Sequence, residues 1–151
     1  MAWLDPSKVK YLVVHCADTT VNMDIGAKEI NEWHKARGWD GIGYHYVIRR
    51  NGKIENGRAL TVRGAHVEGY NGQSIGVCLV GGAKKGAGGK LTPESNFTPE
   101  QWATLKDLLL GLTKKFPGAV PVGHNDLTDK KACPSFKVAD WIKTLPSGTF
   151  S

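Results

Sequence analysis

The chain has 151 residues, of which 40% are hydrophobic and 23% charged, with a formal net charge of +6. This length and apolar content fit one globular domain, predicted to span residues 1–151, and exclude a disordered chain. No apolar run approaches the roughly 20 residues that cross a bilayer, and the N-terminus lacks the layout of a secretory signal, so we expect no membrane insertion and folding in a cytoplasm.

The positive charge favours attraction to polyanions such as nucleic acid, acidic lipids or cell-wall polymers, without choosing among them. Much of the excess lies in lysine pairs at 84–85, 114–115 and 130–131. Most lysine pairs are solvated surface, and only the last pair lies beside other reactive side chains, in the stretch GHNDLTDKKACPSF. That stretch is either an ordinary polar loop or half of a reactive site.

The first elements along the chain are predicted to be a strand and a helix. Residues 10–15 form a short apolar run rich in β-branched residues, which predicts a central strand ending at His15. Apolar positions at helical spacing predict a helix over residues 25–37, with Asp24 as its N-cap and Gly38 after its end.

A hairpin is expected over residues 43–58. Its Asn51-Gly52 pair is typical of a type I′ turn, in which both residues adopt positive φ. Alternation along the first arm predicts one inward face, made by Tyr44, Tyr46 and Ile48.

Further along, residues 74–82 read as a second buried strand that contains Cys78 as a core residue. The glycines and lysines of residues 83–96 then predict an exposed flexible loop within the same domain.

The clearest helix signal begins at Thr98, which is followed by Pro99 and, three residues after the cap, by Gln101. This is the pattern of a capping box with proline at the first helical position. The helix ends before Pro117, and its apolar stripe consists of Trp102, Leu105, Leu108, Leu109, Leu112 and Phe116.

Residues 119–124 predict a short strand ending in His124, and residues 135–145 a last helix. Strands that alternate with helices, together with a hairpin, indicate an α/β fold (α+β in some schemes) with a mixed central β-sheet flanked by helices. His15 and His124 each end an apolar strand, and the carboxyl ends of strands are where ligand sites form in open α/β sheets.

Zinc is the metal that fits the residues near these strand ends. His15, His124 and Cys133 would supply two imidazoles and a thiolate, leaving a fourth position for water. The net positive charge of that complex would lower the pKa of bound water toward about 7. The spacing alone is weak evidence, and two histidines satisfied by ordinary hydrogen bonds remain the alternative.

Four segments, VVHCADT, GYHYVIRRNG, GYNGQSIGVCLVGG and KACPSF, resemble the small phage lysozymes that are zinc-dependent N-acetylmuramoyl-L-alanine amidases. The resemblance runs in order from about residue 11 to about residue 142 and extends more distantly to peptidoglycan recognition proteins. It implies the same metal ligands, namely His15, His124 and Cys133. A cysteine at 133 implies an enzyme, because family members that only bind peptidoglycan often have serine there.

The resemblance also implies two catalytic residues, Tyr44 and Lys131. Lys131 would stabilise the oxyanion formed at the amide carbonyl, and Tyr44 would act as a hydrogen-bond donor or as a base. One extra residue between His124 and the lysines leaves Lys130 as the alternative to Lys131.

Other positions are assigned less directly. His66 and Asn71 are expected to contact the glycan or peptide of the substrate, whereas His34 and His45 are expected to be structural. Cys16 adjoins a ligand, but neighbouring strand residues point to opposite faces, so we expect it to be buried away from the metal.

The predicted function is hydrolysis of the bond between N-acetylmuramic acid and L-alanine in peptidoglycan. A glycosidase would need two carboxylates across the scissile bond, and no such pair stands out. The resemblance implies a monomeric phage endolysin that binds no nucleic acid and accumulates in the host bacterial cytoplasm before acting on periplasmic peptidoglycan.

Two alternatives from other classes stay open. One is a non-catalytic peptidoglycan-binding module. The other is regulatory binding to a phage RNA polymerase, which one phage lysozyme of this kind inhibits. The N-terminal segment MAWLDPSKVK does not match that lysozyme well, so this second role requires a binding measurement.

Overall fold

The computed structural model describes residues 2–150, and its centre is a mixed sheet of five strands in the order β3-β2-β4-β1-β7. β1 pairs in parallel with β4 and β7, β2 pairs in parallel with β4, and β3 is antiparallel to β2. The strands are β1 (Tyr11–Cys16), β2 (Tyr46–Ile48), β3 (Ile54–Asn56), β4 (Ser74–Leu79) and β7 (Val120–Gly123). The predicted mixed central sheet is confirmed.

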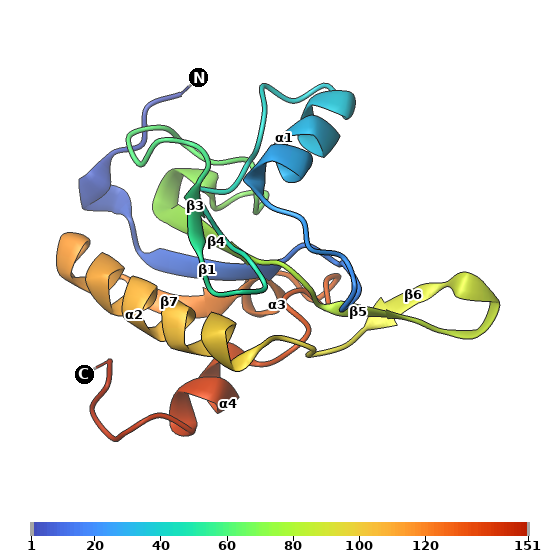
Figure 1. The fold of residues 1–151 in the computed structure, drawn as a ribbon. Helices are drawn as coiled ribbons and strands as arrows, with labels where there is room; N and C mark the ends of the chain where they lie inside the picture. The colour runs from blue at the N-terminus through green and yellow to red at the C-terminus, as the bar shows by residue number, and fades with distance from the viewer. Residues whose placement is uncertain (1, 151) are drawn as a thin grey trace.

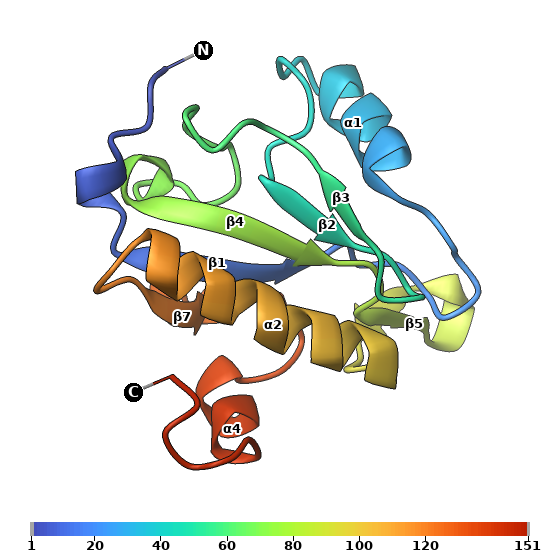
Figure 2. The ribbon, with the colours of Figure 1, turned by 60° about the vertical axis from the view of Figure 1, so that its left-hand side comes forward.

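Helices cover both faces of this sheet. Figures 1 and 2 show α1 (Ala27–Ala36) on one side, and α2 (Pro99–Lys115) with α4 (Val138–Lys143) on the other. A short helix, α3 (His124–Leu127), follows β7 directly, and 3-10 turns occupy Pro6–Lys8, Asn71–Gln73 and Ala87–Gly89. Within the described residues, no helix is long and apolar enough to cross a membrane.

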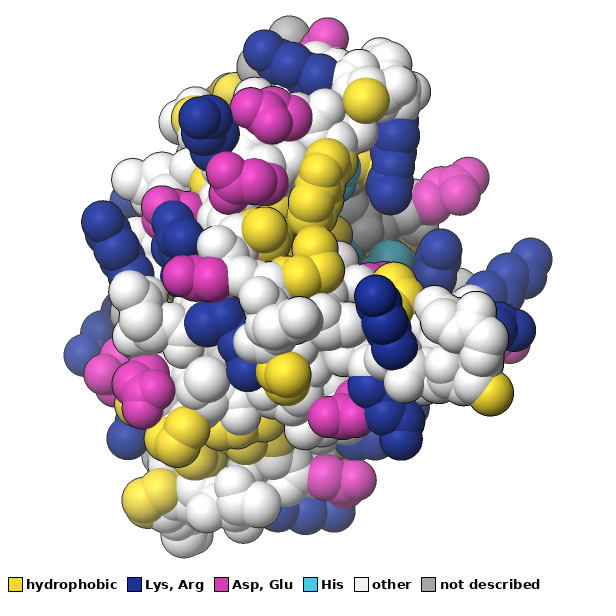
Figure 3. Space-filling view, turned by 45° about the vertical axis from the view of Figure 1, so that its right-hand side comes forward, with side chains coloured by type: hydrophobic (Ala, Val, Ile, Leu, Met, Phe, Trp, Pro, Cys, Tyr) yellow, Lys and Arg dark blue, Asp and Glu magenta, His cyan; other side chains and the backbone are white. Residues whose placement is uncertain are grey.

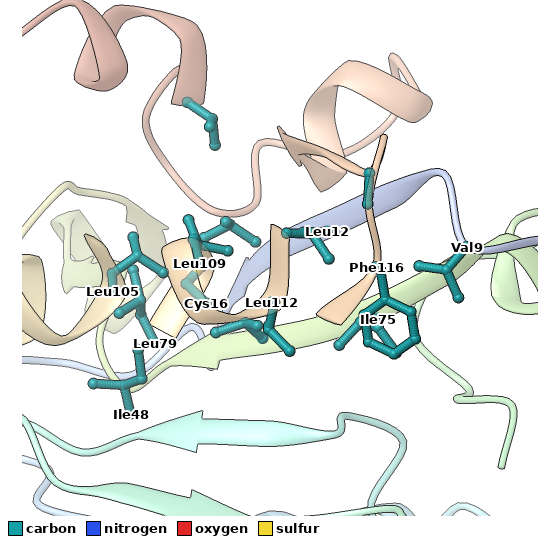
Figure 4. Packing of buried hydrophobic residues seen from close by; sticks show 14 of the residues in the cluster. Val9, Leu12, Cys16, Ile48, Ile75, Leu79, Leu105, Leu109, Leu112 and Phe116 are labelled. Carbon is teal, nitrogen blue, oxygen red and sulfur yellow. The ribbon is translucent and has the colours of Figure 1, made fainter. Parts of the chain in front are cut away.

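The larger part of the core lies between the sheet and α2 (Figure 4). Leu105, Leu109 and Leu112 of α2 are buried there, as their helical spacing predicts. From the sheet come alternate residues of the two central strands, which share one face because successive side chains point to opposite sides: Leu12, Val14, Cys16, Ile75, Val77 and Leu79.

A smaller apolar cluster lies on the α1 face, where Ile30 packs with Val47, Cys78 and Val80. Cys78 is fully buried, as predicted. His15 of β1 is opposite Cys78 of β4 in the parallel register, so the His15 side chain lies on this same face. The strands thus direct apolar residues toward α2 and a histidine toward α1.

The capping box at the start of α2 is confirmed. The Thr98 hydroxyl accepts from the Gln101 N–H at 3.1 Å, and the Gln101 carboxamide accepts from the Thr98 N–H at 3.0 Å. The same carboxamide donates to the carbonyls of Ile48 and Val80, at 3.2 and 2.8 Å. Gln101 therefore joins the start of α2 to the ends of β2 and β4.

The predicted hairpin is present, but the prediction of a type I′ turn at its tip is wrong. Among the described residues other than glycine, only Asp18 and Ser135 have positive φ, so Asn51 does not. Gly52 has a φ of +86°, its N–H donates to the Arg49 carbonyl, and the Arg49 N–H donates to Lys53. This is a three-residue loop with glycine in the left-handed position.

The alternation predicted for the first hairpin arm is also wrong, because Val47 and Ile48 are both fully buried. Helices cover both faces of the sheet, so neither face of β2 is free to be polar. The N-cap of α1 is Gly26, whose N–H donates to Glu29, and Asp24 lies before it.

Three other boundaries differ from the prediction. The expected flexible loop contains a two-stranded hairpin of β5 (Ala83–Lys85) and β6 (Leu91–Pro93), which projects from the body in Figure 1. His124 begins α3 and does not end β7. The last helix starts only at Val138, because Ser135 has a φ of +75°, which a right-handed helix excludes, and the N-cap Lys137 is extended.

Candidate metal centre

His15, His124 and Cys133 come together in the structure. One ligand atom from each residue lies within 4.8 Å of the other two, and His15 Nδ1 is 3.8 Å from Cys133 Sγ. Ligands at normal zinc–nitrogen and zinc–sulfur distances in a tetrahedron lie roughly 3.6 Å apart. The three donor atoms are therefore spaced closely enough to share one metal ion.

The parallel sheet explains how two histidines from distant segments meet. Val14 of β1 is opposite Gly123 of β7, so the next residues, His15 and His124, leave neighbouring strand ends together. Their rings lie 4.7 Å apart between centroids in an edge-to-face arrangement.

Asn125 holds the cysteine segment beside these histidines. Its N–H donates to the Cys133 carbonyl at 2.9 Å, and its side-chain nitrogen donates to the carbonyls of Ala132 and Phe136. Three hydrogen bonds thus fix the loop around Cys133 to the residue that follows His124. The ligand pair separated by nine positions is one local unit.

The surroundings favour the protonation states that metal ligands require. Burial lowers the pKa of His15 well below its usual value, with further lowering by His66 and His124, so its ring is neutral and keeps a free lone pair. Burial also lowers the pKa of His124, and the Lys131 charge lowers it further. The Cys16 N–H donates to Cys133 Sγ at 3.2 Å and holds the sulfur beside the two histidines.

Cys16 itself is buried as expected. Its side chain belongs to the core cluster on the α2 face, opposite to the face that carries His15. Two main causes raise the pKa of the Cys16 thiol: a hydrogen bond with the Cys133 side chain, which is the larger, and burial. The thiol therefore stays protonated. Cys16 also forms part of the cavity wall at the end of β1. It therefore lies closer to Cys133 than the alternation of side chains along a strand predicts.

The cluster lies in a cavity of about 600 Å³. In Figure 3 histidine side chains show in a recess beside hydrophobic and basic side chains. Besides the three candidate ligands, the wall contains four residues that the sequence singled out, Tyr44, Lys131, His66 and Asn71. The wall also contains residues that the sequence did not single out for a site: Asp18, Trp33, Arg37, Trp39 and Glu68.

Tyr44 packs beside the first ligand, with its ring centroid 5.0 Å from that of His15. Burial is the main cause that raises the pKa of Tyr44 well above 10. The phenol is therefore protonated at neutral pH and can donate a hydrogen bond. Of the two adjacent lysines, Lys131 lines the cavity, whereas Lys130 does not belong to its wall.

His66 and Asn71 lie at the cavity, where hydrogen bonds within the protein engage both ring nitrogens of His66 and the carboxamide oxygen of Asn71. His66 Nδ1 is 2.8 Å from His15 Nε2, and His66 Nε2 is 3.2 Å from the Ser74 hydroxyl. The Asn71 carboxamide oxygen accepts from the N–H groups of His66 and Val67, both at 3.0 Å. This geometry argues against the substrate contact expected for His66, whereas the contact expected for Asn71 stays a prediction.

The other two histidines have internal partners. His45 Nδ1 accepts from the Gly76 N–H at 3.0 Å, and its Nε2 donates to the Val62 carbonyl. His34 Nδ1 accepts from the Gly43 N–H at 2.9 Å. These bonds fit the expected structural roles, although His34 also forms part of the cavity wall.

Sequence reasoning missed two kinds of site residue. Ser74 begins a buried strand inside the segment GYNGQSIGVCLVGG, but nothing there marks it as a site residue, so only its contact with His66 reveals it. Trp33 is one of the helically spaced apolar residues of the predicted helix over residues 25–37, yet it is 39% exposed and lines the cavity, while Ile30 and His34 are the buried residues of α1.

His15 and His124, at the carboxyl ends of neighbouring parallel strands, and the Cys133 thiol form a group that could hold a metal ion beside a cavity, a donor set typical of catalytic metal sites in hydrolases. The chain belongs to the N-acetylmuramoyl-L-alanine amidase family, which matches residues 5–136. The predicted family and enzyme class, an amidase acting on peptidoglycan, are thereby confirmed.

Similar proteins agree with this assignment. The chain is 49% identical over 131 residues to an endolysin of Enterobacteria phage K11, covering 87% of this chain and 83% of the relative. It is 45% identical over 130 residues to the endolysin of Escherichia phage T7, covering 86% and 83%.

Solved structures show the same architecture. The N-acetylmuramoyl-L-alanine amidase LysC from Clostridium intestinale has a TM-score of 0.76 at 27% identity, covering 95% of this chain and 91% of that one. The Drosophila peptidoglycan recognition protein LB has a TM-score of 0.72 at 24% identity, covering 96% and 85%, and shows the shared fold. The fold expected from the resemblance is confirmed.

Proposed function

We propose that this protein is a zinc-dependent endolysin that hydrolyses the amide bond between N-acetylmuramic acid and L-alanine. The observation that carries the proposal is the convergence of His15, His124 and Cys133, with donor atoms within 4.8 Å, in the wall of a cavity. When bound, a zinc ion at such a site activates water and polarises the scissile carbonyl.

The donor set fits zinc better than it fits a hard cation. Imidazole nitrogen and thiolate sulfur are zinc ligands, whereas magnesium and calcium require oxygen ligands. The neutral imidazole of His15 supports this choice, because it keeps a lone pair available for the metal.

Tyr44 and Lys131 supply the remaining chemistry. Lys131 is an exposed lysine on the cavity wall, and its ammonium group is suited to stabilise the oxyanion that forms when the carbonyl is attacked. Tyr44 acts as a donor that orients the carbonyl or the attacking water, because its raised pKa keeps the phenol protonated at neutral pH. Lys131 takes this role and Lys130 does not, because only Lys131 lines the cavity.

The cavity contains two carboxylates, Asp18 and Glu68, which are the groups that a glycosidase would need. The metal cluster does not include them, and the family match favours amide hydrolysis. Release of free amino groups without new reducing ends from purified peptidoglycan would separate the two reactions.

We extend the proposal to the cellular setting, which the similarity to phage endolysins supports. The protein acts as a monomer, accumulates in the host bacterial cytoplasm and reaches periplasmic peptidoglycan after release. Regulatory binding to a phage RNA polymerase is a separate hypothesis, to be tested by a direct binding measurement with the purified polymerase.

The test of the proposal compares the parent chain with Cys133→Ser and Tyr44→Phe. Bound zinc is measured by elemental analysis, and activity by the free amino groups released from peptidoglycan. We expect Cys133→Ser to lose zinc and activity together, and Tyr44→Phe to keep zinc and lose turnover. Full activity after thorough chelation would contradict the zinc mechanism, and peptidoglycan binding without turnover in the parent chain would indicate a binding module.

A further inference from the structure

A chain of hydrogen bonds leads away from the first candidate ligand into the protein. His15 presents Nδ1 to Cys133 Sγ at 3.8 Å, and its other ring nitrogen, Nε2, is 2.8 Å from His66 Nδ1. The chain continues from His66 Nε2 to the Ser74 hydroxyl at 3.2 Å. It ends where that hydroxyl donates to the Tyr70 carbonyl at 2.8 Å.

The Ser74 hydroxyl has one proton, and its shorter contact is the 2.8 Å bond to the Tyr70 carbonyl, against 3.2 Å to His66 Nε2. With the proton on the shorter bond, the Ser74 oxygen accepts from His66 Nε2, and this assignment sets the remaining protons of the chain. A neutral His66 ring with its proton on Nε2 has an acceptor at Nδ1. His15 must therefore donate from Nε2, which leaves its Nδ1 lone pair directed toward Cys133.

The ring of His66 is held firmly enough to serve this purpose. Only 8% of the residue is exposed, and its N–H donates to the Asn71 side chain. Its ring lies against Gly76 of β4, where a Cβ atom would stand 2.8 Å from ring carbons. A side chain larger than hydrogen at position 76 would therefore displace the ring.

We propose that His66 is a positioning residue for metal binding, which with Ser74 holds His15 in the tautomer that presents Nδ1 to the ion. This inference rests on the proposed function, because it requires His15 to be a zinc ligand. It replaces the substrate contact that the sequence suggested for His66, whose two ring nitrogens are both engaged. Partners of this kind fix the orientation and basicity of ligand histidines, and their loss typically weakens metal binding about 10–100-fold.

A matched pair of variants separates positioning from packing. Asn and Leu have nearly the same shape, and in place of His66 each would leave a similar gap beside Gly76. Only asparagine offers an oxygen near the position of His66 Nδ1, where it can accept from His15 Nε2. Ser74→Ala is a milder change, because it removes the group that fixes the His66 proton and leaves the His66 ring in place.

The experiment measures the zinc dissociation constant of each full-length variant by competition with a chromophoric chelator. Thermal unfolding of the metal-free proteins is recorded beside it, and the tautomer of His15 is read from the nitrogen chemical shifts of its ring. We expect His66→Leu to weaken zinc binding about 10–100-fold and to lose the Nε2–H preference of His15. His66→Asn should have a zinc dissociation constant closer to that of the parent and a melting temperature similar to that of His66→Leu. The dissociation constant of Ser74→Ala should lie between those of the parent and His66→Leu.

Equal loss of zinc affinity in His66→Asn and His66→Leu would overturn the inference, and so would parent-like affinity and tautomer in His66→Leu. Cys133→Ser, measured in parallel, distinguishes this failure from failure of the proposed function. If the parent binds zinc through Cys133 and hydrolyses peptidoglycan while His66→Leu binds zinc normally, only the positioning role is wrong. If the parent does not bind zinc at all, the proposed function is wrong as well.

Discussion

The two faces of the central sheet differ sharply, although the same strands build both. Toward α2, β1 and β4 direct only apolar side chains and the Cys16 thiol, which pack against leucines of the helix (Figure 4). Toward α1, the same β1 carries His15, whose neighbours include the rings of His66, His124 and Tyr44. One face contributes stability through burial, and the other holds polar groups that need partners.

A buried polar residue therefore reveals which specific neighbours it has, and a buried apolar residue does not. An apolar side chain in the core needs no specific neighbour, whereas each buried imidazole needs a donor or acceptor at a defined position. Substitutions on the two faces should therefore have separable effects: on the α2 face they change the free energy of unfolding, and at the site they change zinc binding or turnover.

The largest change in stability is expected on the α2 face. Leu109 is fully buried, so Leu109→Ala should lower the free energy of unfolding by about 2–5 kcal/mol, measured by denaturant unfolding. Leu110→Ala is the matched control on the same helix, because Leu110 is only partly buried and should cost less. Zinc affinity should stay at the parent value in both, and a large loss in Leu109→Ala would mean that the faces are coupled.

The largest change in activity is expected in the cavity. Lys131→Ala should lower kcat about 10²–10³-fold, because it removes a group that stabilises the oxyanion, and should leave the melting temperature and bound zinc unchanged. Lys130→Ala removes the same charge one residue away and should retain parent activity. The reverse result, with loss confined to Lys130→Ala, would assign the catalytic role to the other lysine.

Acid should lower the free energy of unfolding of the metal-free protein through His34, which lies on the site face. Burial lowers the pKa of His34 to about 4, below the value of about 6.5 in the unfolded chain. Between these two values the unfolded chain binds more protons, so His34 makes stability fall as the pH falls, by at most about 1.4 kcal/mol per pH unit. The stability of the metal-free protein between pH 7 and 4, compared with His34→Asn, measures this contribution.

Asparagine at position 34 keeps an acceptor for the Gly43 N–H and removes the titrating ring. The variant should therefore show a shallower dependence of stability on pH than the parent. Identical slopes for the two proteins would show that His34 does not contribute to the acid sensitivity.

The smallest effect concerns the cap of α2. Thr98→Ala should lower the free energy of unfolding by about 1 kcal/mol, because the Gln101 N–H loses its partner. The Thr98 hydroxyl also donates to the Arg50 carbonyl. Thr98→Ser keeps both bonds and should have a free energy of unfolding near that of the parent. Both variants are compared with the parent by denaturant unfolding, and equal losses in the two would argue against a role for the hydroxyl.

Much of the fold could be predicted from the sequence because its signals are local. The capping box at Thr98 and the leucine spacing of α2 depend on residues within a few positions of each other, and both predictions were confirmed. The type I′ turn at Asn51-Gly52 was wrong because the same pair also fits a longer loop, in which only Gly52 needs positive φ. A dipeptide does not determine loop length.

The candidate ligands were predictable for a different reason. His15 and His124 end apolar segments, and adjacent parallel strands bring their carboxyl ends together. Pairing between residues far apart in the sequence decided the rest: which nitrogen of His15 faces Cys133, which lysine lines the cavity, and where Trp33 points.

By itself the sequence determined the mixed sheet, the principal helix and the three candidate metal ligands, because periodicity, caps and side-chain chemistry are properties of the residues. Only the tertiary structure decided the role of His66. Its two ring nitrogens find their partners in His15, 51 residues away, and in Ser74 at the start of another strand. A hydrogen bond requires two atoms at a definite distance, and that distance exists only after the strands have paired.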